Sequence, residues 1–153
     1  MSLADYGANL ATLYRLFSAK AKHVIWTTTT PCPNVTTSMG ESCCALASRI
    51  ARSSQLTCAA TVVCAVGRTD AKVRAYNAAA LKSLTQAATA AGKKLLIDDL
   101  YSAVDKACGA NYKSCALQKP QNVHFQPKGC EYMAEHVAAS IVAALNETSD
   151  ADE

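Results

Sequence analysis

Cysteine and histidine are the residue types in this chain whose side chains are best suited to chemistry. The sequence of 153 residues holds eight cysteines and three histidines. No two cysteines form the closely spaced CxxC pair that is typical of structural zinc sites, and the spacing therefore indicates disulfides rather than a metal centre. The alternative is a set of reduced, partly buried thiols. The cysteines are Cys32, Cys43, Cys44, Cys58, Cys64, Cys108, Cys115 and Cys130.

Two glycosylation sequons, which begin at Asn34 and Asn146, favour the disulfide interpretation. Such sequons are used only on a secretory route, where the compartment is oxidising. For a secreted parent protein we expect at least two disulfides. One should join Cys108 to Cys115, because the short loop between them allows an easy turn, and others should lie within the segment 32–64.

The histidines differ in their sequence surroundings. His124 stands between Val123 and Phe125, where an imidazole can be either a proton acceptor, with a pKa of about 6.5, or a buried structural group. His23 falls at the entry to a predicted strand and His136 on the surface of a predicted helix. We assign neither of these two a chemical role.

The elements that must position these residues are predicted from apolar spacing. Asp5 is expected near the N-cap of the first helix, Gly92 closes the second at its C′ position, and Asp98 or Asp99 caps the third. Two β-branched or apolar runs predict strands. We predict helices at 5–19, 70–91 and 100–106, a last helix ending near residue 146, a weaker helix at 43–50, and strands at 24–28 and 94–97.

Alternating helices and strands are typical of a doubly wound parallel α/β sheet. We expect the two strands to be adjacent and parallel, with His124 on a loop near their carboxyl ends. Two strands cannot cover the apolar stripes of four helices, so we expect the chain to be part of a larger sheet. The open edge should then cause self-association of the isolated chain.

Composition restricts the protein class. The chain is 50% hydrophobic and 18% charged, which is typical of a soluble globular protein. Fifteen basic residues against twelve acidic ones give a net charge of +3, and their scattered positions argue against nucleic acid as a partner. No apolar stretch is long enough to span a membrane. The first residues lack a basic and an apolar region, so we expect no signal peptide in this chain.

Four segments together resemble the C-terminal half of the SGNH (GDSL-type) hydrolase family. They are Val-Ile-Trp-Thr-Thr-Thr-Thr-Pro at 24–31, Val-Arg-Ala-Tyr-Asn-Ala-Ala-Ala at 73–80, Leu-Ile-Asp-Asp-Leu-Tyr at 96–101, and Val-His-Phe at 123–125 followed by Gly129. The resemblance implies a partial flavodoxin-like three-layer α/β/α sandwich with parallel strands, whose N-terminal strands are missing here. Residues 1–153 would be the C-terminal portion of one such domain, with a cysteine-rich loop at about 32–69.

The activity implied by this resemblance is that of a serine esterase or acylhydrolase without a cofactor or metal. His124 matches the catalytic histidine, which activates a serine hydroxyl. The family's serine, glycine and asparagine blocks lie upstream of the segments found here, so we expect the isolated chain to be inactive. Gln121 stands where the family has its acid, with Asn122 beside it. A side-chain carbonyl of either could orient the imidazole without supplying a charge.

Other residues and functions compete with this interpretation. Ser42, in Gly-Glu-Ser at 40–42, and Cys130 are alternative nucleophiles, but Ser42 follows a polar loop rather than a strand and Cys130 begins a helix. The second functional hypothesis is a non-catalytic, degenerate hydrolase domain that acts as a secreted binding module. As an enzyme, the domain would act on a small ester, for example of a carbohydrate or lipid, and its parent would be secreted or enter the secretory pathway.

Overall fold

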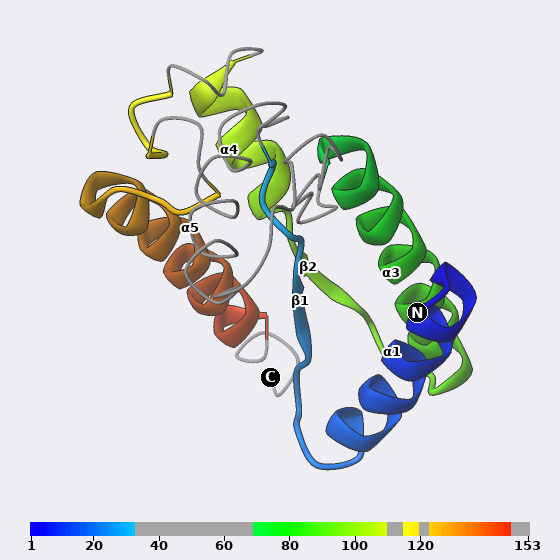
Figure 1. Ribbon diagram of the computed structural model, residues 1–153. Coiled ribbons are helices and arrows are strands. Elements are labelled where there is room, and N and C mark those ends of the chain that lie inside the picture. Colours follow the sequence, from blue (N-terminus) through cyan, green and yellow to red (C-terminus); the bar gives the residue numbers. More distant parts are fainter. Residues whose placement is uncertain (33–68, 110–114, 120–122, 148–153) are drawn as a thin grey trace, which may run out of the picture.

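The computed structural model describes residues 1–32, 69–109, 115–119 and 123–147, and these form a mixed α/β structure (Figure 1). The expected α/β class is confirmed. The predicted helix at 43–50 and most of the cysteine-rich loop lie outside the described residues. In chain order, the elements are α1 (Leu3–Ser18), β1 (Ile25–Thr27), α3 (Asp70–Ala90), β2 (Leu96–Asp98), α4 (Leu100–Cys108) and α5 (Pro127–Asn146).

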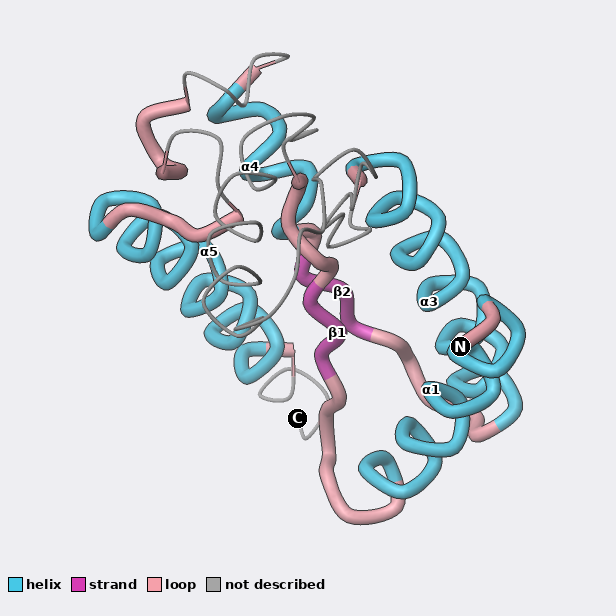
Figure 2. The backbone as a smooth tube through the Cα atoms, in the orientation of Figure 1, coloured by secondary structure: helices cyan, strands magenta, loops and turns pink. Residues whose placement is uncertain are grey.

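The strands β1 and β2 lie side by side between the helices (Figure 2). They pair in parallel, with Trp26 opposite Ile97 and Thr27 opposite Asp98. The ladder extends beyond β1, where the Thr28 N–H donates to the Asp98 carbonyl at 3.0 Å. The predicted parallel pairing is therefore confirmed, although each strand is only three residues long.

Helices cover both sides of the strand pair (Figure 1). On one side, α1 and α3 form a core with Trp26, and the small residues of α3 allow the two helices to approach closely. Because successive strand residues face opposite sides, Thr27 faces away from Trp26, toward α5. The buried core residues are Leu10, Tyr14, Ala80, Leu84 and Ala88.

Most helix ends follow the predicted capping. The N-cap of α1 is Ser2 rather than Asp5, and the Asp5 side chain completes a capping box with it. Gly92 adopts a φ of 63° after α3, a conformation that favours glycine, and the Asp99 side chain caps α4. None of the helices within the described ranges is long and apolar enough to cross a membrane.

A buried asparagine fixes the chain where it leaves β1. The Nδ2 of Asn77, on α3, donates to the Thr29 carbonyl at 2.8 Å, and the Thr29 N–H donates to Asn77 Oδ1 at 2.9 Å. One side chain thus satisfies both backbone groups of a residue that has just left the sheet. These two bonds orient the segment after β1 along α3.

We predict that Asn77→Ala lowers the free energy of unfolding by about 1 to 3 kcal/mol, because both backbone groups of Thr29 lose their partner. Asn77→Asp keeps the acceptor and should lose less. Urea unfolding monitored by circular dichroism measures both. Asn9→Ala, on the exposed side of α1, is the control and should change the stability by at most about 0.5 kcal/mol. Equal stability of Asn77→Ala and the native chain would contradict this account.

Candidate functional site

His124 lies in the loop that precedes α5. It is exposed, and its backbone carbonyl accepts a hydrogen bond of 2.9 Å from the Lys119 N–H. The neighbouring residues Gln118 and Phe125 form an antiparallel bridge. The two segments that flank 120–122 are therefore paired with each other. Gln121 and Asn122, predicted to orient the imidazole, lie outside the described residues, as does Ser42.

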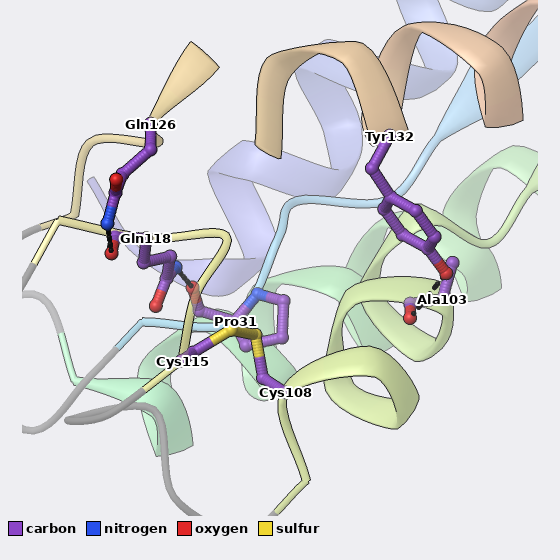
Figure 3. Close-up of a disulfide and its surroundings, with 7 residues drawn as sticks. All are labelled: Pro31, Ala103, Cys108, Cys115, Gln118, Gln126 and Tyr132. Carbon is purple, nitrogen blue, oxygen red and sulfur yellow. Dashed lines mark hydrogen bonds between the residues drawn. A yellow bond between two sulfur atoms is a disulfide. The ribbon is translucent and has the colours of Figure 1, made fainter. Parts of the chain in front are cut away.

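A disulfide fastens this loop to α4. Cys108, the last residue of α4, is bonded to Cys115, as the sequence predicted (Figure 3). The two cysteines are seven positions apart in the sequence, so the disulfide closes a short loop. The further disulfides expected within 32–64 lie outside the described residues, apart from Cys32, which is buried.

Residues 117–118 of this loop also form hydrogen bonds with the residue that precedes α5. The Gln126 N–H donates to the Leu117 carbonyl at 2.8 Å, and the Gln126 side chain donates to the Gln118 carbonyl at 3.0 Å. Gly129 lies so close to the Leu117 carbonyl that a Cβ at this position would overlap its oxygen. The absence of a side chain at Gly129 lets α5 begin directly against the loop that carries His124.

A buried glutamine joins the loop to the strand pair. Gln118 is 1% exposed, and its Nε2 donates to the carbonyl of Pro31 at 3.2 Å (Figure 3). Pro31 follows the carboxyl end of β1. His124 therefore belongs to a loop that is held at the carboxyl end of two parallel strands, which is where open α/β sheets bind their ligands.

Polar residues cluster at this same end of the strands. The hydroxyl of Thr28 accepts the Tyr101 N–H at 2.8 Å and donates to Asp99 at 3.1 Å. Burial acts to raise the pKa of Asp99, but hydrogen bonds from Ser102 and Thr28, together with nearby His136, outweigh burial, so the pKa lies below its usual value. Asp99 is therefore ionised at neutral pH.

Tyr101 and Asp70 join the starts of α4 and α3. The tyrosine hydroxyl donates to both carboxylate oxygens of Asp70, at 3.0 and 3.1 Å, and Arg74 pairs with the same carboxylate at 3.3 Å. Burial, then the hydrogen bond and charge of Asp70, raise the pKa of Tyr101 to about 12. A phenol held protonated in this way is a hydrogen-bond donor, which suits a structural role.

A second cluster, which the sequence did not reveal, surrounds Asp98. Its side chain is fully buried, with His136 Nδ1 at 2.8 Å from Oδ1. Ser140 donates to the same oxygen and Thr27 to the other, both at 3.1 Å. Of the two residues expected to cap the third helix, Asp98 and Asp99, the N-cap of α4 is Asp99. The sequence signal for the cluster was a histidine and a serine four residues apart on α5, which places both on one face.

The Asp98 cluster resembles part of a catalytic relay, since a carboxylate on Nδ1 orients an imidazole. The Ser140 hydroxyl, however, bonds to Asp98 rather than to His136, so these residues do not form a serine–histidine–aspartate sequence. Their contacts join β1, β2 and α5 instead. Within the described ranges, no three metal-binding side chains gather in one place.

Comparisons with known proteins identify no relative of this chain. No family model, no curated protein and no solved structure matches the chain.

Replacing Gly129 tests how closely α5 and the loop approach. We predict that Gly129→Ala lowers the stability by about 1 to 3 kcal/mol, because its Cβ must displace the backbone of Leu117. Thermal unfolding measures the loss. Gly7→Ala is the matched control, since a Cβ there meets the movable side chain of Ser83, and it should lose less. Equal losses for the two variants would show that the contact with Leu117 is unimportant.

Removing His136 tests the Asp98 cluster. His136→Ala leaves a buried carboxylate without its imidazole partner, and we predict a loss of about 3 kcal/mol, the low end for a broken buried pair because the imidazole is 35% exposed. Ser140→Ala should lose about 1 kcal/mol. Urea unfolding of the single variants Asp98→Asn and His136→Ala and of the double variant completes the test. The loss of stability in the double variant should be clearly smaller than the sum of the losses in the two single variants. Additive losses would mean that the two side chains act independently.

Proposed function

We propose that this chain is the C-terminal portion of an SGNH (GDSL-type) serine ester hydrolase domain. The parallel strand pair, with α1 and α3 on one side and α5 on the other, is consistent with part of a flavodoxin-like three-layer sandwich (Figure 1). In that sandwich, helices cover both faces of a parallel sheet. Further strands beside β1 would complete it.

The observation that carries the proposal is the location of His124. Its loop is fastened to the segment after β1 through Gln118 and leads directly into α5. An imidazole that activates a hydroxyl has to lie where the ends of the parallel strands deliver substrate and nucleophile. The loop of His124 meets that requirement in the described part of the chain.

Exposed apolar side chains support the expectation of further strands. Leu13 and Phe17 on α1 are 45% and 58% exposed, and Ile141 and Val142 on α5 are 45% and 55% exposed. Among the described residues, β1 has no strand neighbour other than β2. A larger sheet would cover such surfaces. In the isolated chain the same surfaces and the open strand edge favour self-association.

In the proposed mechanism, His124 takes the proton of a serine that the upstream part of the domain supplies. The serine oxygen then attacks the carbonyl carbon of a small ester, for example of a carbohydrate or lipid, and upstream donors stabilise the oxyanion. As the ester bond breaks, His124 returns its proton to the leaving alcohol, and water then hydrolyses the acyl-serine to release the acid and the free hydroxyl. The side-chain carbonyl of Gln121 or Asn122 orients the imidazole but supplies no charge. No cofactor takes part.

The alternative is a secreted binding module that has lost catalysis. The residue that favours it is Gln121, because an amide in place of the family's acid cannot stabilise an imidazolium as a carboxylate does. The two functions differ in one measurable property, which is turnover of an ester by the completed domain.

Hydrolysis of p-nitrophenyl acetate tests the proposal. We predict that the chain alone is inert, because each missing oxyanion donor lowers the rate by about 10² to 10³. Co-expression with the polypeptide encoded upstream should restore turnover. In that complex His124→Ala should abolish most of the activity, whereas Gln121→Asp should raise it near neutral pH.

His23→Asn serves as the control in the same complex and should leave the rate unchanged. Turnover by the chain alone that survives His124→Ala would refute the proposed roles and direct attention to Ser42 or Cys130. A folded but inactive complex would favour the binding module.

A further inference from the structure

We infer that Gln118 is the positioning residue for His124: its buried amide fixes the loop of His124 relative to the carboxyl end of β1. The significance of this for catalysis rests on the proposed function, but the geometry does not. Gln118 contacts the His124 loop through its backbone and the segment after β1 through its side chain.

The backbone of Gln118 is joined to the residues on both sides of His124. It forms a bridge with Phe125, its carbonyl accepts the side chain of Gln126 at 3.0 Å, and the next residue, Lys119, donates to the carbonyl of His124 at 2.9 Å. A displacement of Gln118 would therefore move the loop of His124 with it.

The side chain of Gln118 fixes the loop relative to the segment that follows β1. Its Nε2 donates to the carbonyl of Pro31, which follows β1, so one amide joins two segments that are 87 residues apart in sequence. The disulfide at Cys115, three residues earlier, ties the same loop to α4 instead. The covalent bond and the hydrogen bond thus fix the loop against two different elements.

The side-chain oxygen of Gln118 distinguishes a positioning role from simple packing. Within the described part of the chain, Gln118 Oε1 is buried and accepts no hydrogen bond. An unsatisfied buried acceptor destabilises a fold, so an apolar side chain of the same length would serve packing equally well or better. What the glutamine supplies, and methionine would not, is the donor to Pro31.

The test replaces Gln118 with methionine, which has a similar length and shape. Because Gln118→Met removes an unsatisfied acceptor but leaves the Pro31 carbonyl without its donor, we expect the Tm to stay within about 4 °C of the native value. In the same variant, amide hydrogen exchange of Lys119 and Gln126 should accelerate at least about tenfold, while the amides of α1 and α3 keep their rates.

A spectroscopic signature of His124 completes the test. Its ring NMR signals, assigned with His124→Asn, should shift and broaden in Gln118→Met. Tyr132→Phe is the matched control, because it removes a similar bond from a side chain to a carbonyl, that of Tyr132 to Ala103 at 3.1 Å (Figure 3). This control should leave the signals of His124 and the exchange of Lys119 and Gln126 unchanged.

Two results would overturn the inference. One is unchanged exchange at Lys119 and Gln126 together with unchanged His124 signals. The other is a general loss of protection that includes α1 and α3, which would mean that Gln118 stabilises the whole fold. Should Gln118→Met fail to fold, Gln118→Leu is measured in the same way. None of these readouts involves ester hydrolysis, so absence of turnover would count against the proposed function alone.

Discussion

The fully buried carboxylate of Asp98 is the interaction on which the arrangement of this structure depends. It lies at the end of β2 and receives hydrogen bonds from β1, through Thr27, and from α5, through His136 and Ser140. A buried carboxyl group is tolerated only where such hydrogen-bond partners surround it. The requirement to satisfy Asp98 therefore holds α5 on the side of the strands opposite α1 and α3.

Side chains, rather than a long ladder, hold the carboxyl ends of the strands together. With three residues in each strand, few backbone bonds join β1 to β2. Asn77 instead binds both backbone groups of Thr29, and Gln118 binds the carbonyl of Pro31. The segment after β1 is thus fixed from α3 on one side and from the His124 loop on the other. Such fixed polar contacts are what a site needs if an imidazole is to act in a defined direction.

Local patterns in the sequence predicted the elements well. The helix expected at 70–91 is α3, Asp70–Ala90, closed by Gly92, and the parallel pairing of the two strands is confirmed. Cys108 and Cys115 also pair as predicted, because their separation alone favours a closed loop. The helix and the disulfide depend on residues close together in the chain, and the parallel pairing follows from the alternation of helices and strands.

The polar contacts could not be predicted in the same way. Asp98 and His136 are 38 residues apart, and nothing in a local window shows that one will satisfy the other. Gln118 likewise looks like an ordinary loop residue until the fold buries it against Pro31. For His124, the sequence shows the residue type and its place before the last helix, whereas its relation to the end of β1 depends on these long-range contacts.

The location of His124 beside a serine nucleophile can be tested with a crystal structure of the chain in complex with the polypeptide encoded upstream. We predict a serine hydroxyl of that polypeptide within hydrogen-bond reach of the His124 imidazole, about 2.6 to 3.2 Å. A complex in which His124 faces solvent, with no serine from the upstream part near it, would contradict the account.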